Sequence, residues 1–499
     1  MKLNVNRILL LGCLAMPFTA AKAQTGPVIA GDFADPSIIK TPQGYFATAT
    51  SSEWAPHYPI YSSQDLQTWK QVGYVFDKAP EWTSGSFWAP EYYFHNNTYY
   101  LYYTARRKSD NVSCIGVATS KYPDKGFKDH GVLVDFGKEA IDAFIYNDNG
   151  QLYITFKAYG LDKRPIEILG SKLSADGLKL EGEPFSMLKD TPGIGMEGQS
   201  ILKKGNYYYL FYSAGNCCGN GCSYHVRVAR SATFAGPYEE YSQNPILQTH
   251  EAWKCPGHGT FAQTKEGKYM YIYHAYNEAN NVFTGREGLM AELVWPADNS
   301  WPSFVSRHTE SKPVDLTTSF AEKKPAGYWQ WDFRNSQPVF TQKNGSLYLT
   351  GSVKEGNKTG LVLTVRPVST NFDVTTTVAN TNAALKGLAF YGDVNAAIGV
   401  GVVNDKIEYW LVKDNKRSVL ATANIKAGLP IQLKLTTYDD HHGEAFYRQA
   451  NGSWQQVGDK QNIGFLPQWD RSPRPGLHYQ GDGKQQAVFN EFKITNKTK

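Results

Sequence analysis

Acidic and histidine side chains recur in five short segments of this sequence, each among small or aromatic residues. The segments are residues 33–36, 88–91, 141–144, 195–198 and 257–259, and they contain Asp35, Glu91, Asp142, Glu197 and His258. Paired carboxyl groups can act as a general acid and a general base. Cleavage of a glycosidic bond with inversion uses such a pair: one carboxylic acid protonates the leaving oxygen, and one carboxylate, about 6.5 to 9.5 Å away, activates water.

The elements between these segments explain how they could meet. The segments recur with a period of roughly 50 to 60 residues, in the range that marks propeller blades. A turn followed by an aromatic-rich strand comes after four of them, at residues 97–103, 150–156, 205–212 and 267–273, and further strands are expected at 115–120 and 226–231. A radial array of sheets places the innermost strand of every blade along one axis. We therefore expect a five-bladed β-propeller over residues 25–310, with these carboxyl groups facing its channel.

The repeat stops after Trp301, and residues 306–326 have the composition of a surface connection. Strands are expected again at 372–378, 398–403 and 431–436, separated by turn signals such as Asn451-Gly452. This spacing predicts a two-sheet β-sandwich over residues 325–497.

Composition and the N-terminus limit the choice of partner and location. The formal net charge is only +5 over 499 residues and no dense Lys/Arg block occurs, which argues against nucleic acid as a partner. Residues 1–23 have the basic start, apolar run and small-residue end of an export signal, so we expect a periplasmic or extracellular protein. An alternative is a lipoprotein signal with a lipid anchor on Cys13. No other segment has the ~18 apolar residues needed to span a bilayer.

Five cysteines follow the leader, namely Cys114, Cys217, Cys218, Cys222 and Cys255. Their odd number leaves at least one thiol unpaired. Cys217, Cys218 and Cys222 lack the paired spacing of a zinc site, so we expect disulfides that staple a loop.

The five segments, in this order, resemble the successive blade motifs of family 43 glycoside hydrolases, and the match covers about residues 31–295. The resemblance implies that Asp35 is the general base and Glu197 the general acid. It also implies that Asp142 orients the acid and raises its pKa by like charge. The second domain resembles the lectin-like accessory domain of many members, which implies a concanavalin-like jelly-roll sandwich.

Further site residues are expected on the same resemblance. The substrate-binding candidates are Phe33, Trp88, Glu91, Phe144 and Arg286. The rings of Phe33 and Trp88 could stack on a sugar face, whereas Arg286 could instead form a surface ion pair. His258 corresponds to the central histidine of the family, which in several members helps to hold a calcium ion or a water cluster on the axis. Calcium there would need oxygen ligands and waters.

These features predict an inverting glycoside hydrolase that releases terminal pentose from plant polysaccharides or oligosaccharides. α-L-Arabinofuranose is the first choice of sugar and β-D-xylose the second, and residues 216–219 resemble loops of the arabinan-cleaving branch. A β-galactofuranosidase or an endo-arabinanase would use the same chemistry. A non-catalytic glycan-binding propeller or a structural scaffold would leave the recurrence of the carboxyl groups unexplained.

Overall fold

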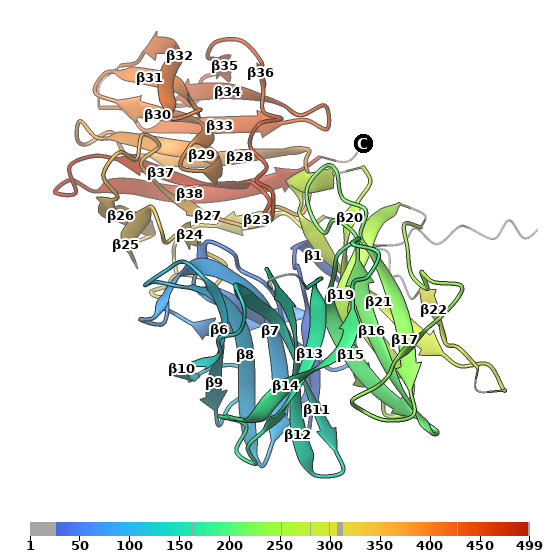
Figure 1. Cartoon of the computed structure of the whole chain (residues 1–499). Coiled ribbons are helices and arrows are strands. Elements are labelled where there is room, and N and C mark those ends of the chain that lie inside the picture. The colour runs from blue at the N-terminus through green and yellow to red at the C-terminus, as the bar shows by residue number, and fades with distance from the viewer. Residues whose placement is uncertain are drawn as a thin grey trace, which may run out of the picture.

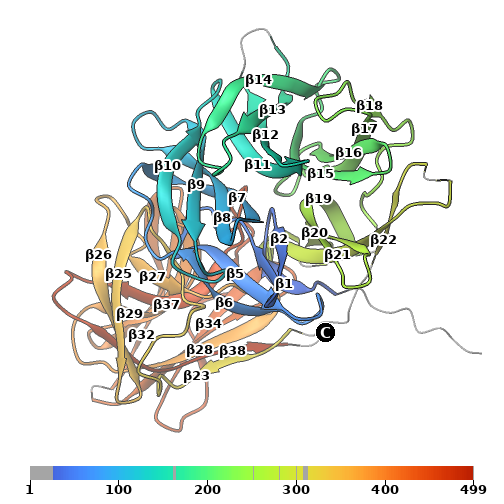
Figure 2. The same cartoon turned by 90° about the horizontal axis from the view of Figure 1, so that it is seen from below.

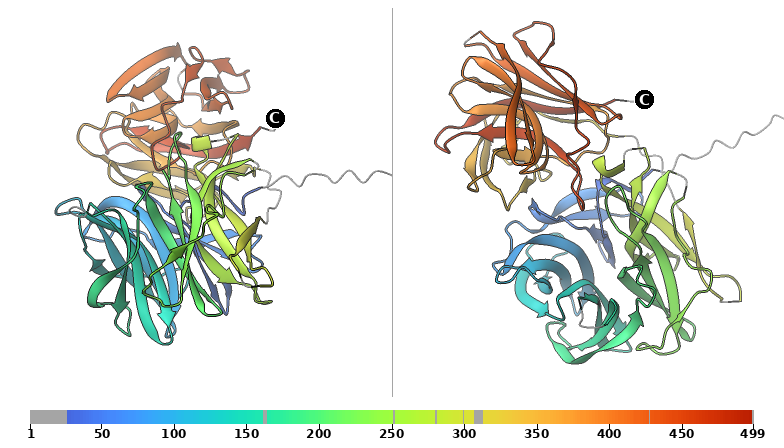
Figure 3. Two further views of the ribbon diagram at one scale, coloured as in Figure 1. Left: turned by 45° about the vertical axis from the view of Figure 1, so that its right-hand side comes forward. Right: turned by 45° about the horizontal axis from the view of Figure 1, so that its top comes forward.

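The computed structural model describes residues 26–160, 164–250, 252–279, 281–298, 300–306, 313–426 and 428–497. These residues form β-strands and one short 3₁₀-helix, η1 (Asn281–Phe283), and no helix among them is long and apolar enough to cross a membrane. The strands build a β-propeller and a β-sandwich that lie against each other (Figures 1 and 3), which confirms the all-β fold class. The expected export signal and Cys13 lie outside the described residues.

Four blades of the propeller are antiparallel sheets whose strands pair in their order along the chain. Their strands are β2 (Ser37–Thr41), β3 (Gly44–Thr48), β5 (His57–Ser63) and β6 (Lys70–Phe76) in blade 1; β7 (Thr83–His95), β8 (Thr98–Arg107), β9 (Ser113–Ser120) and β10 (Lys128–Val134) in blade 2; β11 (Glu139–Asp148), β12 (Gln151–Tyr159), β13 (Glu167–Leu173) and β14 (Leu180–Lys189) in blade 3; and β15 (Met196–Lys204), β16 (Tyr207–Ala214), β17 (His225–Ser231) and β18 (Glu239–Glu240) in blade 4.

Blade 5 joins the two ends of the propeller segment. It contains β19 (Trp253–Gln263), β20 (Tyr269–Asn277) and β21 (Arg286–Val294). β1 (Ile29–Asp32) and β22 (Ser303–Ser306) pair with the first and second halves of β21. Because β1 precedes blade 1 in the chain, its pairing with β21 closes the ring. The first strands of neighbouring blades contact one another, so β2, β7, β11, β15 and β19 surround a common axis (Figure 2).

The aromatic runs of the sequence form the second strands of the blades, which are buried on both faces. In β8, Tyr100 and Tyr102 pack into the core shared with blade 3, whereas Tyr99, Leu101 and Tyr103 pack into the core shared with blade 1. Successive side chains of a strand point to opposite faces, so a strand between two cores needs apolar groups at every position. This is why these segments read as continuous hydrophobic runs.

The sandwich consists of two antiparallel sheets around a common core. One sheet has β25 (Ser336–Lys343), β26 (Ser346–Val353), β38 (Ala487–Asn496), β28 (Phe372–Val378), β33 (Ile431–Thr437), β34 (His442–Gln449) and β35 (Gln455–Gln456), with β23 (Leu316–Thr318) on β38 and β36 (Gln461–Asn462) on β34; the other has β27 (Leu361–Thr364), β37 (Arg474–Gln480), β29 (Leu385–Asp393), β30 (Ala396–Val403), β31 (Lys406–Lys413) and β32 (Lys416–Asn424). The sandwich therefore includes a strand, β23, that precedes the expected boundary at residue 325.

A short strand pair and an apolar contact join the two domains. β4 (Trp54–Ala55), from blade 1, pairs with β24 (Trp331–Asp332). The indole of Trp54 is buried in a cluster with Tyr391 and Trp410 of the sandwich. The guanidinium of Arg474 lies 4.3 Å from the centre of the Trp54 ring. These contacts fix the sandwich beside the propeller channel.

Candidate active site

One residue of each blade has a left-handed backbone conformation where the chain reaches the channel, and we call these five the channel residues. They are Asp35 (φ 50°), Ala89 (φ 39°), Asp142 (φ 59°), Gly198 (φ 59°) and His258 (φ 43°). In β7, β11, β15 and β19 the pairing register also breaks around this position. Such breaks bend a strand and re-aim its side chains. The repeat of the sequence therefore encodes a repeated kink that turns polar groups towards the axis.

Side chains of the preceding blade hold most channel residues in place. The backbone N–H of the channel residue donates to Nδ1 of His274 at Asp35 (3.0 Å), to Oγ1 of Thr50 at Ala89 (2.8 Å), to Oγ1 of Thr104 at Asp142 (3.2 Å) and to Oγ of Ser213 at His258 (2.7 Å). A buried N–H group without a partner would be costly, so each bond satisfies the kinked backbone and ties two blades together. The channel is thus a preorganised polar centre.

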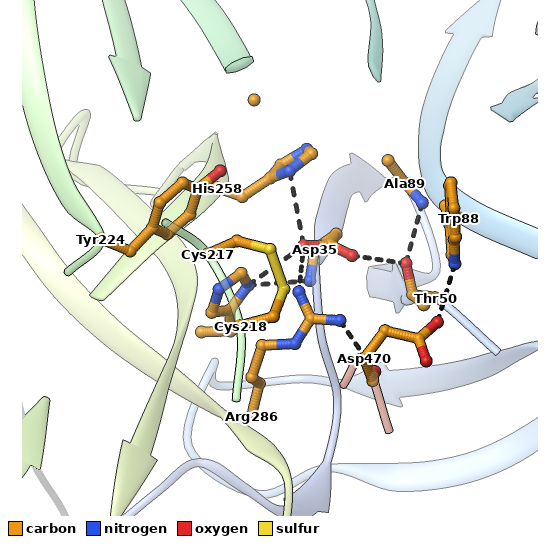
Figure 4. A network of polar contacts seen from close by, with 12 residues as sticks. Asp35, Thr50, Trp88, Ala89, Cys217, Cys218, Tyr224, His258, Arg286 and Asp470 are labelled. Carbon is orange, nitrogen blue, oxygen red and sulfur yellow. Dashed lines mark hydrogen bonds and ion pairs between the residues drawn. A yellow bond between two sulfur atoms is a disulfide. The ribbon is translucent and has the colours of Figure 1, made fainter. Parts of the chain in front are cut away.

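Asp35 is buried within a network of donors (Figure 4). Its carboxylate accepts from Nη1 of Arg286 at 3.0 Å and from the hydroxyl of Thr50 at 2.6 Å, and Nδ1 of His258 lies 3.4 Å away. Burial alone would raise the pKa of Asp35, but the charge of Arg286, followed by His258, His274 and Thr50, holds it well below its usual range. The neighbouring groups therefore favour the ionised form of the Asp35 carboxyl group.

Glu197 and Asp142 are two further carboxyl groups of the site. Oε2 of Glu197 accepts from Nζ of Lys157 at 2.5 Å and Oε1 accepts from the hydroxyl of Tyr224 at 2.9 Å. Burial raises the pKa of Glu197, but the charge and hydrogen bond of Lys157 lower it below its usual value. Burial raises the pKa of Asp142 to about 6, with His258 opposing and Glu197 adding to the increase. The expectation that Asp142 raises the pKa of Glu197 is wrong for this arrangement, because Lys157 outweighs it.

These groups share one pocket of about 360 Å³. Its lining includes six residues that the sequence singled out, namely Asp35, Trp88, Asp142, Glu197, His258 and Arg286. Ligand pockets typically measure 300 to 1,000 Å³, so this one suits a small ligand. Three carboxyl groups in one such pocket, with the pKa of Asp142 raised and those of Asp35 and Glu197 lowered, can perform acid–base chemistry.

Three expected substrate contacts are wrong. Phe33 is fully buried and packs edge-on against Tyr61 at 5.2 Å. Glu91 is buried and accepts from the hydroxyl of Ser37 at 2.7 Å, and the half-buried ring of Phe144 packs on the core between blades 3 and 4. Glu91 and Phe144 miss the pocket because of their positions along β7 and β11. The channel residues of blades 2 and 3 are Ala89 and Asp142, so Glu91 and Phe144 lie two residues further along their strands, away from the pocket.

Comparisons with known proteins identify the family of the chain. The model of the family "Glycosyl hydrolases family 43" matches residues 24–302. The chain belongs to glycosyl hydrolase family 43. It is therefore a glycoside hydrolase, and its substrate is a polysaccharide or oligosaccharide.

Among curated relatives of this family 43 chain, the extracellular exo-α-(1→5)-L-arabinofuranosidase ArbA of Cellvibrio japonicus is 29% identical over 320 residues, which cover 56% of this chain and 88% of ArbA. The non-reducing end α-L-arabinofuranosidase BoGH43B of Bacteroides ovatus is 27% identical, over 57% of this chain and 54% of that protein. The solved GH43 structure BlXynB from Bacillus licheniformis superposes with a TM-score of 0.81 at 21% identity and covers 95% of this chain and 99% of that chain. At that identity the superposition shows a shared fold across both domains.

The family 43 propeller does not form its pocket alone, because the sandwich contributes Trp469 and Asp470. Trp469 is 59% exposed, and its ring lies 6.3 Å from that of Trp88. The Asp470 carboxylate accepts from Nε1 of Trp88 at 3.1 Å and from the hydroxyl of Ser52 at 2.9 Å, and its carbonyl accepts from Arg286 at 3.2 Å. Sequence reasoning missed these two residues, because they lie outside the blade repeat.

The cysteines shape another wall of the pocket. Cys217 and Cys218, in the loop between β16 and β17, form a disulfide between neighbouring residues and line the pocket. Cys222 is bonded to Cys255, which ties this loop to β19, and Cys114 is a buried free thiol. The expectation that the cysteine cluster staples a loop is confirmed.

A calcium ion near His258 stays a prediction. Among the residues that the structure describes, no group of three or more His, Cys, Asp or Glu side chains is arranged to hold a metal ion. The Asp35 carboxylate is already bonded to Arg286 and Thr50. These protein groups therefore fit a calcium site poorly, and no catalytic step below uses one.

Proposed function

We propose that this enzyme removes single terminal pentoses, α-L-arabinofuranose first and β-D-xylose second, from plant polysaccharides or oligosaccharides with inversion. The observation that carries this proposal is the form of the pocket. It measures about 360 Å³, near the lower end for ligand pockets, and has walls from both domains and from the Cys217–Cys218 disulfide. A small pocket with walls on several sides suits a chain end better than the middle of a polymer.

The curated relatives support the choice of sugar. ArbA of Cellvibrio japonicus and BoGH43B of Bacteroides ovatus are named as α-L-arabinofuranosidases, and a relative from Bacillus subtilis is named as a β-xylosidase. The last is 26% identical over 58% of this chain. Arabinofuranosides and β-D-xylosides present their anomeric carbon and leaving group similarly, so one set of carboxyl groups serves both.

In the proposed mechanism, Asp35 removes a proton from water as that water attacks the anomeric carbon. Arg286 and Thr50 hold Asp35 ionised and oriented for this step. Glu197 acts in its protonated form, whose share Lys157 reduces at neutral pH: it gives its proton to the departing oxygen, and the bond from that oxygen to the anomeric carbon breaks. Attack and departure occur on opposite faces, so the configuration inverts. Exchange with solvent then removes the proton from Asp35 and returns one to Glu197.

Asp142 orients the acid without contacting the reacting atoms. Its Oδ2 accepts from the N–H of Gly198 at 3.1 Å, next to the acid in the chain. Nε2 of Gln199 donates to the carbonyl of Asp142, which adds a second tie between β11 and β15. Asp142 thereby fixes the backbone that carries Glu197.

A panel of nitrophenyl glycosides tests the proposal: α-L-arabinofuranoside, β-D-xyloside and β-D-galactofuranoside, followed by arabino-oligosaccharides with product analysis. We expect the highest kcat/KM on the arabinofuranoside and release of monosaccharide from oligosaccharides. A Glu197→Gln preparation serves as the control for contaminating activity. Release of oligosaccharides from linear arabinan as the first products would contradict terminal action, and a preference for the galactofuranoside would contradict the choice of pentose.

We also propose that the enzyme works outside the cytoplasm, in the periplasm or the medium. Its relative ArbA is named as extracellular, and residues 1–23 have the pattern of an export signal. Cell fractionation tests this location, and enzyme activity retained in the cytoplasm would contradict it. Incorporation of labelled palmitate, lost on Cys13→Ala, would identify the lipid-anchored form.

A further inference from the structure

The second strands of the blades share a position that faces the channel residues. In the pairing of first and second strands, Trp88 lies opposite Thr104, Ile141 opposite Lys157, Glu197 opposite Ser213 and Gly257 opposite His274. In blade 1 the corresponding residue is Thr50, whose N–H donates to the carbonyl of Ala34. The equivalent positions are therefore Thr50, Thr104, Lys157, Ser213 and His274.

Lys157 differs from the other four. Thr50, Thr104, Ser213 and His274 each accept a hydrogen bond from the N–H of the next channel residue. A lysine ammonium has no acceptor, so Lys157 cannot do this for Gly198. That N–H donates instead to Oδ2 of Asp142 at 3.1 Å. In blade 3, therefore, a cation, Lys157, occupies the position that holds a hydrogen-bond acceptor in the other blades, and this position faces the strand that carries Glu197.

The long side chain of Lys157 reaches past the backbone to the acid itself. Its Nζ lies 2.5 Å from Oε2 of Glu197, the Lys157 side chain is only 12% exposed, and the ammonium lies 4.9 Å from the centre of the Tyr159 ring. On the other side of the carboxyl group, the hydroxyl of Tyr224 donates to Oε1. Glu197 is thus held by one donor on each oxygen.

Other titratable groups face this pair from the neighbouring strands. Asp142 and Glu139 come from β11, and both stabilise the charged form of Lys157. His258, from β19, favours the ionised form of Glu197. Glu139 is in turn bonded to the hydroxyl of Tyr159 and lies 3.6 Å from Arg106. The net effect is a lysine that remains a cation although it is buried, because carboxyl groups surround it.

We propose that Lys157 is a positioning residue that holds the Glu197 carboxyl group at the pocket wall and stabilises the charge left on it when its proton passes to the leaving group. The inference rests on the proposed acid role of Glu197. In this step the O–H bond of Glu197 breaks, an O–H bond forms on the leaving oxygen, and Lys157 keeps all its protons. A stabilised carboxylate makes Glu197 a stronger acid, and it also confines the protonated form that donates to the leaving group to lower pH.

Lys157→Met tests the inference, since methionine is similar in length and carries no charge. An opposite charge at such a distance lowers a carboxyl pKa by about 1 to 3 units, so its loss should raise the alkaline limb of kcat/KM by about 1 to 3 pH units. The rate should also depend more steeply on leaving-group pKa across a series of aryl glycosides. Lys157→Arg keeps the charge and should stay close to the wild type in both respects.

Lys203→Met is the matched control, because Lys203 also contacts a carboxylate and a tyrosine, Asp148 and Tyr208, but does not line the pocket. It should leave the alkaline limb and the leaving-group dependence in place. Unchanged values in Lys157→Met, with a circular dichroism spectrum like that of the wild type, would overturn the inference.

A second readout does not require turnover. The ¹³C carboxyl resonance of Glu197, assigned by its loss in Glu197→Gln, should titrate at higher pH in Lys157→Met than in the wild type. An equal titration would reject the stabilising contact. If the wild-type protein cleaves no glycoside of the panel, the proposed function fails, whereas this titration still decides the role of Lys157.

Discussion

The contact between the sandwich and the pocket gives a prediction about Asp470. In Asp470→Ala the carboxylate that accepts from Nε1 of Trp88 and from the hydroxyl of Ser52 is absent. Ser52 is only 2% exposed, so its hydroxyl would lose its acceptor in a place that water reaches poorly. The backbone carbonyl that accepts from Arg286 remains. The change should therefore loosen Trp88 while the contacts of Asp35 persist.

The size of the effect follows from these bonds. Hydrogen bonds to charged groups contribute about 1.5 to 3 kcal/mol each, so the two together suggest a loss of roughly 3 to 6 kcal/mol in unfolding free energy. Loss of the Arg471 ion pair at 3.1 Å adds to this figure, and water that replaces the carboxylate reduces it. A freed Trp88 would forfeit a ring contact with the sugar worth about 0.5 to 1.5 kcal/mol. That loss corresponds to a rise in KM of about 2-fold to 13-fold, with kcat nearly constant.

Steady-state kinetics on the best nitrophenyl pentoside measure the change in KM, and thermal unfolding measures the loss of stability. Asp393→Ala is the matched control, because Asp393 and Asp470 are both sandwich carboxylates paired with Arg471, but Asp393 does not line the pocket. It should leave KM unchanged. A loss of kcat at constant KM in Asp470→Ala, or equal KM changes in the two variants, would refute the reasoning.

Four further predictions concern the catalytic groups. Glu197→Gln should nearly abolish turnover of substrates with poor leaving groups and affect activated aryl glycosides less; equal losses on both would remove Glu197 from the acid role. Asp35→Asn should reduce kcat by about 10²-fold to 10⁴-fold while sugar binding by calorimetry remains, and more than about a tenth of the wild-type rate would contradict the base role. Arg286→Met should lower stability by about 3 to 5 kcal/mol. Because Arg286 holds the pKa of Asp35 below its unfolded value, that stabilisation is present above about pH 4 and lost as pH falls, so the deficit in Tm should be larger at pH 6 than at pH 3. Proton NMR of the first-released sugar should show the inverted anomer, and a retained anomer would exclude a base and acid about 6.5 to 9.5 Å apart.

The sequence predicted the propeller because each blade repeats the same local physics. A kink at the channel, a turn and a strand buried on both faces leave a pattern of small, turn-forming and aromatic residues that recurs in every blade. The same pattern brought Asp35, Asp142 and Glu197 into one pocket. The pattern failed for Glu91. The pairing register of β7 breaks around Ala89, so Ala89 reaches the channel and Glu91, two residues later, does not.

Residues outside the repeat could not be found in this way. Lys157 occupies a strand position that reads as an ordinary polar residue, and its importance depends on its contact with Glu197 of the neighbouring blade. Trp469 and Asp470 belong to a sandwich loop that meets the pocket only through the packing of two domains. Sequence periodicity describes contacts within blades and between adjacent blades, but it carries no information on contacts between domains.

The closure of the ring by β1 also determines when the site comes into existence. Chains are made and often fold from the N-terminus, and β1 must wait for β21, since the bond from the Arg286 N–H to Oδ1 of Asp32 joins residues 254 positions apart. Asp35 follows β1 directly, and Arg286 is the first residue of β21. The pairing of base and arginine therefore forms only in the last step of ring assembly. A chain whose last blade is incomplete therefore lacks the contact between Asp35 and Arg286, and the appearance of hydrolytic activity would report that the propeller ring has closed.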